Sequence, residues 1–322
     1  MPELAQAVAA AARFVGAHPE DCVPCFNTTT GMTTLLRSLQ LSPGSSVLLF
    51  SSAYSSVKTA AYRAAAAASA TTIEIQVDAE AICDGGTLVQ RLQGALEAAQ
   101  GGVEAVLLDH ILSFPPVVLP VQEMTALCHK VRCLSCAVGV SCCMHQVVRR
   151  VNTRLRTQCT SLPCAWSLVG VELSEGASAC LLPSVSDHLF VLTLCAVQHG
   201  AKVLVDGAHA IGNISLNIPA LGADAYVTNC HKWLCTPRGT ALLWVAKGFQ
   251  DTVRPLVPSH GADLGFQAEH FWQGTADWSA WLAVRTAVEA FERAGLKQLQ
   301  RQQAELLQQG CALLVEAVRC AG

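Results

Sequence analysis

Short apolar runs alternate with stretches of helical period along most of the chain. The runs at residues 23–26, 46–50, 72–77, 105–109, 203–205, 225–228 and 239–245 are bounded by turn or breaker residues, so each predicts a buried strand. A helical period, or a dense run of alanine, predicts helices at residues 2–16, 32–39, 60–70, 88–100, 278–294 and 296–317. This alternation indicates an α/β fold with a mostly parallel sheet flanked by helices. The run at 239–245 is expected to be antiparallel to its neighbour.

Two of the predicted strands end in side chains of complementary chemistry. One ends in Asp206, and the other is followed shortly by the pair His231-Lys232. If both strands belong to one parallel sheet, a carboxylate and an amine meet at its carboxyl edge, where open α/β sheets bind ligands. Pyridoxal phosphate requires this layout, because a lysine binds its aldehyde as a Schiff base and a carboxylate keeps its pyridine nitrogen protonated. Taken alone, the pair also fits two solvated loop charges.

The composition narrows the class of protein. The 322 residues are 52% hydrophobic and 14% charged, which suits a large buried core. With 21 basic and 24 acidic residues, the net charge is −3, and no basic excess points to nucleic acid or a membrane surface as a partner. The first twenty residues lack the pattern of a secretory signal, and the longest nearly uncharged stretches are too short to cross a bilayer. A cytoplasmic protein is expected, with its 16 cysteines as thiols.

The letters around Asp206 and Lys232 resemble one family closely. The motifs D-G-A-H-A, H-K-W and P-R-G-T, at this spacing, are similar to the class V branch of the fold-type I pyridoxal phosphate enzymes. The isopenicillin N epimerase-like and cysteine desulfurase-like members are the most similar. The resemblance extends over residues 2–130 and 199–317. It implies the large domain of a fold-type I transferase, whose two parts are residues 1–130 and 199–295.

The resemblance also implies roles for individual residues. Lys232 falls at the Schiff-base lysine, and Asp206 falls at the partner of the pyridine nitrogen. His209 stands where the family places a side chain near the phenolic oxygen of the cofactor. Asn229 and His231 stand where the family contacts the phosphate.

A polar loop at residues 27–31, Asn-Thr-Thr-Thr-Gly, lies between a predicted strand and a predicted helix. Free N–H groups and the positive end of the helix dipole would face an anion there, although a plain N-cap run has the same letters. The family has a similar loop, usually with Ala at the position of Thr28 and Asn at that of Thr33. The resemblance makes Thr28 and Thr29 candidates for binding the phosphate. Tyr54 falls where the family stacks a ring on the cofactor, although a loop tyrosine fits the same local sequence.

Residues 131–198 interrupt the pattern. They hold half of the 16 cysteines, lack a sustained period, and fall where the family runs directly from a helix into the strand before the aspartate. The valine-arginine start and valine-glutamine end suggest a translated intron, so we expect a poorly ordered insertion; an ordinary surface loop is the other reading. The segment also contains five possible metal ligands, Cys133, Cys136, Cys142, Cys143 and His145. No metal site is expected, because a second properly spaced pair is missing.

The last part of the chain contains one more resemblance. Residues 271–277 are similar to the family's G-T-x-D segment, which reaches the phosphate of the neighbouring subunit, although Ala276 replaces the frequent arginine. Gly274 and Thr275 are therefore candidates for cofactor binding, and a homodimer is expected; a glycine turn before a helix explains the same letters. Residues 296–322 are expected to form a C-terminal helix, the truncated start of a largely missing small domain.

Two functions are compatible with these features. The first is a pyridoxal phosphate enzyme that acts on an amino acid as an epimerase, a desulfurase or lyase, or an aminotransferase. The second is a truncated or interrupted product of such an enzyme without catalysis. A dinucleotide-binding enzyme is disfavoured, because no G-x-G-x-x-G follows a predicted strand.

Overall fold

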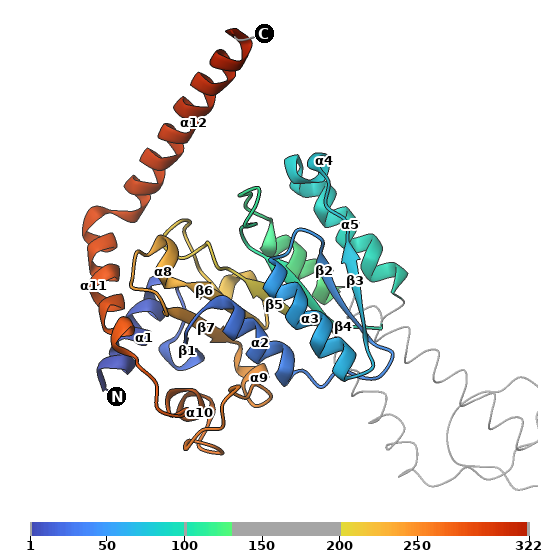
Figure 1. The fold of residues 1–322 in the computed structure, drawn as a ribbon, viewed down its shortest axis with the longest axis vertical. Coiled ribbons are helices and arrows are strands. Elements are labelled where there is room, and N and C mark those ends of the chain that lie inside the picture. Colours follow the sequence, from blue (N-terminus) through green and yellow to red (C-terminus); the bar gives the residue numbers. More distant parts are fainter. Residues whose placement is uncertain (1, 100–101, 131–200, 321–322) are drawn as a thin grey trace, which may run out of the picture. The chain divides into compact units, whose positions relative to one another are not determined.

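The computed structural model describes residues 2–99, 102–130 and 201–320. Residues 1–129 and 201–322 form one unit of the chain. Its centre is a seven-stranded sheet with the order β1-β7-β6-β5-β4-β2-β3 (Figure 1). The strands are β1 (Cys22–Cys25), β2 (Ser46–Phe50), β3 (Thr71–Ile75), β4 (Val103–Asp109), β5 (Lys202–Asp206), β6 (Ala225–Asn229) and β7 (Ala241–Val245).

The sheet is mostly parallel, which confirms the fold class. Strands β3, β2, β4, β5 and β6 pair in parallel, whereas β7 is antiparallel to both β6 and β1, as the sequence predicted for its run. Because β7 is antiparallel to both of its neighbours, β1 points in the same direction as the other five strands. The carboxyl ends of β1, β2, β4, β5 and β6 therefore meet at one edge of the sheet.

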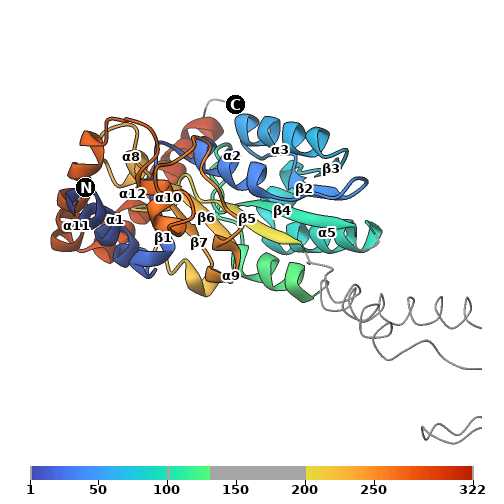
Figure 2. The ribbon, with the colours of Figure 1, turned by 90° about the horizontal axis from the view of Figure 1, so that it is seen from below.

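Helices cover both faces of the sheet. In Figure 2, α2 (Thr28–Ser38) and α3 (Ser55–Ala67) lie along one face and α5 (Gly85–Ala98) along the other. At one end of the sheet, α1 (Pro2–Phe14) packs against α11 (Ser279–Ala294). Strands β5 and β6 are buried along nearly all of their length, as expected for strands covered on both sides. This is why they appear in the sequence as mostly apolar runs without alternation.

A core between α2, α3 and the sheet holds the strand ends in place. Met32 and Leu35 of α2 pack with Leu204 of β5, Val227 of β6 and Leu243 of β7, all essentially without exposure to solvent. Burial of this kind is worth roughly 1.5–3 kcal/mol for each large side chain. The polar residues that follow these strands are thus placed by a rigid base.

Three of the predicted helices, α2, α3 and α5, begin earlier than the sequence indicated. The loop at 27–31 is already helical from Thr28, because Asn27 caps α2 by accepting a hydrogen bond from Thr30 N at 2.8 Å. Helix α3 begins at Ser55 and ends at Ala67, because the chain turns at Ser69, whose φ is +55°. Helix α5 begins at Gly85, where the Asp84 side chain caps its first turn.

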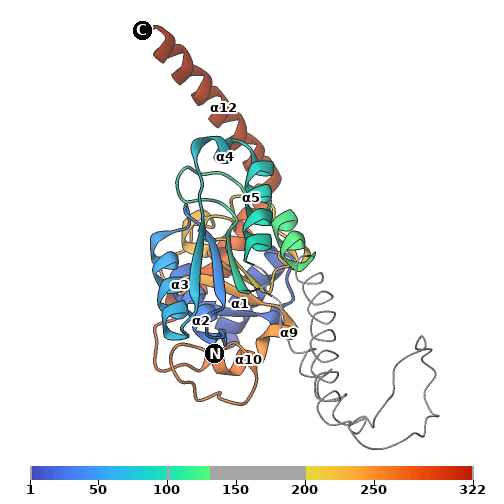
Figure 3. The ribbon, with the colours of Figure 1, turned by 90° about the vertical axis from the view of Figure 1, so that its right-hand side faces the viewer.

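Several short elements were not expected from the sequence. They are α4 (Ala79–Cys83), α8 (Cys230–Trp233), α9 (Lys247–Gln250), α10 (Phe266–Phe271) and the 3-10 turns η1 (Pro19–Asp21) and η2 (Pro219–Leu221). Residues 121–130 are also helical. The last helix, α12 (Leu296–Cys320), was expected, and Figure 3 shows it running away from the sheet.

The predictions for residues 131–198, including the possible metal ligands there, lie outside the described residues. Within the described ranges, no group of His, Cys, Asp and Glu side chains could hold a metal ion, and no helix is long and apolar enough to cross a membrane. Cys22 and Cys25 are free thiols in β1, and burial raises the pKa of each. Such thiols are poor nucleophiles, so this pair does not suit redox exchange.

Candidate active site

The carboxyl edge of the sheet collects the polar strand ends. Asp109 closes β4, Asp206 closes β5 and Asn229 closes β6, and all three side chains are buried. The short helix α8 follows β6 at once and positions His231 and Lys232 above this edge. Sequence and topology therefore place an amine, two carboxyl groups and an amide at neighbouring strand ends.

Lys232 contacts the turn that follows β5. Its Nζ lies 3.0 Å from Nε2 of His209, and the indole Nε1–H of Trp233 donates to Nδ1 of the same imidazole at 3.2 Å. Thr228 of β6 fixes this turn, because its Oγ1 donates to Gly207 O at 2.7 Å and accepts from Ile211 N at 3.3 Å. His209 is thus fixed on both ring nitrogens.

Burial sets the charge balance between Asp206 and Lys232. Burial raises the pKa of Asp206 to about 6, against the opposing effects of the Ala208 N–H, which donates to Oδ1 at 2.9 Å, and of the Lys232 charge. Burial also lowers the pKa of Lys232, while the Asp206 carboxylate opposes this change. At neutral pH the site therefore presents an ionised Asp206 beside an amine that loses its proton more readily than a surface lysine.

The N-terminus of α2 reaches the same edge. Thr28 N donates to Oδ1 of Asn229 at 2.9 Å, so the end of β6 is joined to the start of α2. Oγ1 of Thr28 is buried and has no hydrogen-bond partner among the described residues. The N–H groups of Thr28, Thr30 and Gly31 already have acceptors in Asn229 and Asn27, so the positive dipole end of this 11-residue helix is what favours an anion at this edge.

His231 is oriented by β7. Its Nδ1 lies 2.8 Å from the carbonyl oxygen of Thr240, so Nδ1 carries the hydrogen that this acceptor requires. Burial lowers the pKa of His231, and the Lys232 and Arg238 charges act in the same direction, while the Thr240 carbonyl opposes them. Nε2 remains as the ring nitrogen available to a ligand.

Some predicted site residues are brought together and others are not. Lys232, His209 and Asp206 form one group, and Thr28 and Asn229 form a bonded pair. Thr29 and His231 lie on the helices that carry these residues. Tyr54 precedes α3 and is exposed, and Gly274 and Thr275 are exposed between α10 and α11. In the described part of the chain, no hydrogen bond links these last three residues to the Lys232 group.

Three residues with a place in this site were not assigned a role from the sequence. Asp109 is the register partner of Asp206, and Trp233 bonds His209. Tyr226 is fully buried, and its Oη lies 2.7 Å from Nδ1 of His110. The strand-end position of Asp109 was a usable signal, whereas the contacts of Trp233 and Tyr226 depend on side-chain direction.

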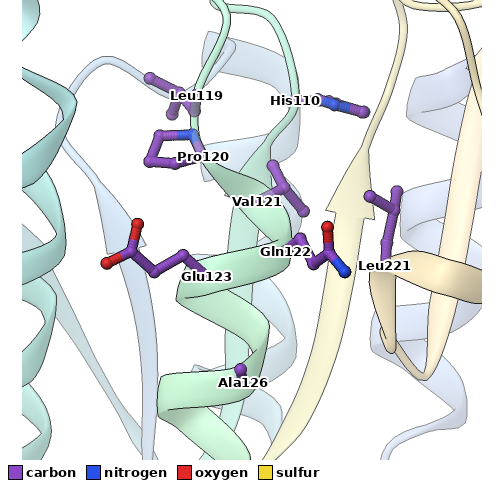
Figure 4. Close-up of a pocket in the computed structure, with 8 residues that line it drawn as sticks. All are labelled: His110, Leu119, Pro120, Val121, Gln122, Glu123, Ala126 and Leu221. Carbon is purple, nitrogen blue, oxygen red and sulfur yellow. The ribbon is translucent and has the colours of Figure 1, made fainter.

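A separate pocket lies beside the helix at residues 121–130. It has a volume of about 520 Å³, and Figure 4 shows its lining residues, His110, Leu119, Pro120, Val121, Gln122, Glu123, Ala126 and Leu221. Burial lowers the pKa of His110 to about 4, so this imidazole is neutral at physiological pH. Neither Lys232 nor Asp206 lines the pocket, which is thus distinct from the Lys232 group.

Comparisons with known proteins agree with this architecture. Residues 189–320 match the model of the family described as aminotransferase class-V. Putative L-cysteine desulfhydrase 1 of Oryza sativa subsp. japonica is 25% identical over 259 residues, which are 79% of this chain and 40% of that protein. The chain thus spans less than half of the length of this relative.

Solved structures share the fold. The apo cysteine desulfurase of Thermococcus onnurineus NA1 matches with a TM-score of 0.66 at 18% identity, covering 98% of this chain and 62% of that chain. A variant of C-DES with glycine covalently linked to its PLP cofactor matches with a TM-score of 0.62 at 19% identity, covering 96% of this chain and 65% of that chain. The fold is that of the fold-type I pyridoxal phosphate enzymes. In its fold, and over residues 189–320 in its sequence, the chain is similar to the class V aminotransferase family.

Proposed function

We propose that the chain binds pyridoxal phosphate through Lys232 and acts as a lyase-type enzyme on a cysteine-like amino acid. The observation that carries this proposal is the Lys232 amine, whose pKa is lowered, lying against His209 beside the buried Asp206. An amine that reacts with an aldehyde must be unprotonated, and a lowered pKa increases that fraction at neutral pH.

The residues at this edge fit the cofactor. Asp206 is ionised above a pH of about 6 and is shielded from water, as a partner for a protonated pyridine nitrogen must be. The start of α2 offers the positive end of its dipole and the unpartnered Oγ1 of Thr28 for a phosphate. Thr29, Asn229 and His231 are the further candidates around that phosphate, and Tyr54 is the candidate for ring stacking.

The chain's own residues have distinct tasks in this scheme. Pyridoxal phosphate, once bound, withdraws electrons from the bonds at the α-carbon of an amino acid. Lys232 holds the cofactor and then carries a proton at its Nζ between the α-carbon and the site. Asp206 keeps the ring nitrogen charged, and His209 offers a ring nitrogen beside Nζ.

The substrate class comes from the relatives. The rice relative is named an L-cysteine desulfhydrase, and the two solved structures are a cysteine desulfurase and C-DES. These names favour cleavage of a carbon–sulfur bond over epimerisation or transamination. A homodimer, in which Gly274 and Thr275 reach a neighbouring subunit, is part of the proposal. The cytoplasmic location stays a prediction.

The first experiment tests cofactor binding. The purified full chain is titrated with pyridoxal phosphate, and the absorption band of the lysine-bound cofactor is followed for the wild type, Lys232→Ala and Lys202→Ala. Lys202 is the matched control, because it pairs with Asp224 at 2.9 Å at the opposite end of β5. The band should appear in the wild type and in Lys202→Ala and be absent from Lys232→Ala.

The second experiment tests the reaction. Sulfide release from L-cysteine is measured beside racemisation and transamination of a panel of amino acids. Sulfide release that depends on Lys232 supports the proposal. A band without sulfide release refutes the substrate class, and the absence of a band in every protein supports the alternative of a chain without catalysis.

A further inference from the structure

Trp233, the residue after the proposed Schiff-base lysine, bonds the imidazole that Lys232 touches. The indole Nε1–H of Trp233 points at Nδ1 of His209 with a nitrogen–nitrogen distance of 3.2 Å. On the other side of the ring, Nε2 of His209 lies 3.0 Å from Nζ of Lys232. One imidazole thus joins the indole to the amine.

These contacts decide which ring nitrogen of His209 carries its hydrogen. Indole nitrogen can only donate, so Nδ1 must accept and cannot itself be protonated. A neutral imidazole has one N–H, which is then on Nε2. Burial lowers the pKa of His209, so the neutral ring is the form at physiological pH.

The hydrogen on Nε2 also determines the form of Lys232. If Nε2 carries the hydrogen, it donates, and Nζ must accept with its lone pair. Only the neutral amine has that lone pair. The opposite arrangement, an ammonium donating to a bare Nε2, would place hydrogen on Nδ1 and set it against the indole N–H.

We propose that Trp233 is a positioning residue that fixes His209 as the Nε2–H tautomer and thereby favours the unprotonated amine of Lys232. This inference deepens the proposed function, on which its catalytic meaning rests.

The backbone around Trp233 supports a positioning role. Gly212, with φ +80°, lets the turn after β5 approach α8 so closely that a Cβ there would lie 2.6 Å from Trp233 O. In the same turn, Asn213 Nδ2 donates to His209 O at 3.1 Å. The imidazole and the indole are therefore held together by their backbones as well as by the bond between their rings.

The other charged groups near Lys232 do not provide this selection. Asp206 favours the charged amine, the opposite of the effect assigned to Trp233. His231 is committed through Nδ1 to the Thr240 carbonyl, and Arg238 acts on His231. Among the described residues, the bond from Trp233 is the contact that distinguishes the two tautomers of His209.

The tautomer is read directly by nitrogen NMR of the cofactor-free full chain labelled at histidine. The His209 signals are identified by their loss in His209→Gln. We expect the pattern of a bare Nδ1 and a protonated Nε2 in the wild type. In Trp233→Phe, which keeps an aromatic ring and loses the N–H, the Nδ1–H form should gain population. Trp272→Phe, another exposed tryptophan, is the matched control and should resemble the wild type.

The protonation of the Lys232 amine is followed by its rate of reaction with an amine-selective acylating reagent. The rate is measured at Lys232 by mass spectrometry as a function of pH. Trp233→Phe should shift this profile to higher pH and slow the reaction at neutral pH by about fivefold, which corresponds to the loss of one ordinary hydrogen bond. A purely structural role for Trp233 would leave the midpoint of the profile unchanged.

The outcomes separate this inference from the proposed function. Hydrogen on Nδ1 in the wild type, or an unchanged tautomer and profile in a folded Trp233→Phe, overturns the inference. If Trp233→Phe does not fold, the wild-type tautomer alone decides. The predicted tautomer in a chain that never binds pyridoxal phosphate supports the inference and refutes the proposed function.

Discussion

Asp109 and Asp206 are register partners on the adjacent parallel strands β4 and β5, so two buried carboxyl groups stand side by side at the carboxyl edge of the sheet. Two such groups cannot both be ionised without cost. Burial first, and the charge of Asp206 second, raise the pKa of Asp109 well above its usual value. Asp206 therefore ionises first, and Asp109 keeps its proton. Asp206 is therefore the carboxyl group that carries the negative charge at this edge.

Asp109→Asn is expected to stabilise the cofactor-free chain at neutral pH. The folded pKa of Asp109 lies above the unfolded value, so the folded state holds a proton that the unfolded chain releases. The free energy of unfolding then falls as pH rises above about 4, by about 1.4 kcal/mol for each pH unit up to the folded pKa. Asparagine removes this loss. Urea unfolding at mildly acidic and at neutral pH measures the change, and wild-type and variant curves that stay parallel would contradict it.

Asp206→Asn is expected to stabilise the cofactor-free chain and to lower its activity. The amide oxygen can still accept from Ala208 N, as Oδ1 of Asp206 does at 2.9 Å. Burial raises the pKa of Asp206 to about 6, so ionisation destabilises the folded chain as pH rises from about 4 towards that value, and asparagine avoids this cost. Without the carboxylate, turnover should fall by at least about a hundredfold. Thermal unfolding and sulfide release test both halves, and an active variant would refute the role of Asp206.

Gly207→Ala is expected to lower the free energy of unfolding by about 1–3 kcal/mol or more. A Cβ at this position would lie 2.2 Å from atoms of the Tyr226 ring. The ring cannot yield easily, because it is fully buried and its Oη lies 2.7 Å from Nδ1 of His110. Gly248→Ala in α9 is the matched control, since nothing lies within 4 Å of a Cβ there. Denaturant unfolding should show a loss only for Gly207→Ala, and equal effects would mean that the Tyr226 contact does not matter.

The fold could be predicted because its central strands are buried on both faces. The runs that end at Asp206 and Asn229 are largely apolar, and the polar residues at their ends mark the edge where parallel strands end. Helix α2 begins earlier than predicted, at Thr28, because Asn27 is its cap, as the alternative interpretation of these letters as an N-cap run had it. The pairing of Asp109 with Asp206 depends on strand order, and the bond from Trp233 to His209 depends on side-chain direction. Sequence patterns do not contain either quantity.

Asn229→Asp is expected to keep the fold and to weaken cofactor binding only because the new carboxylate repels the phosphate of the cofactor. A carboxylate can still accept from Thr28 N, as Oδ1 of Asn229 does at 2.9 Å. Its negative charge near the start of α2 is stabilised by the helix dipole. A phosphate at the proposed place would be repelled, and like charges about 4 Å apart repel by about 1–4 kcal/mol, depending on solvent access. Affinity for pyridoxal phosphate should therefore fall about tenfold or more. Affinity for pyridoxal, which has no phosphate, should not change, and absorbance titration of both compounds against wild type and variant compares them. An equal loss for the two compounds would place the phosphate away from Asn229 and the start of α2.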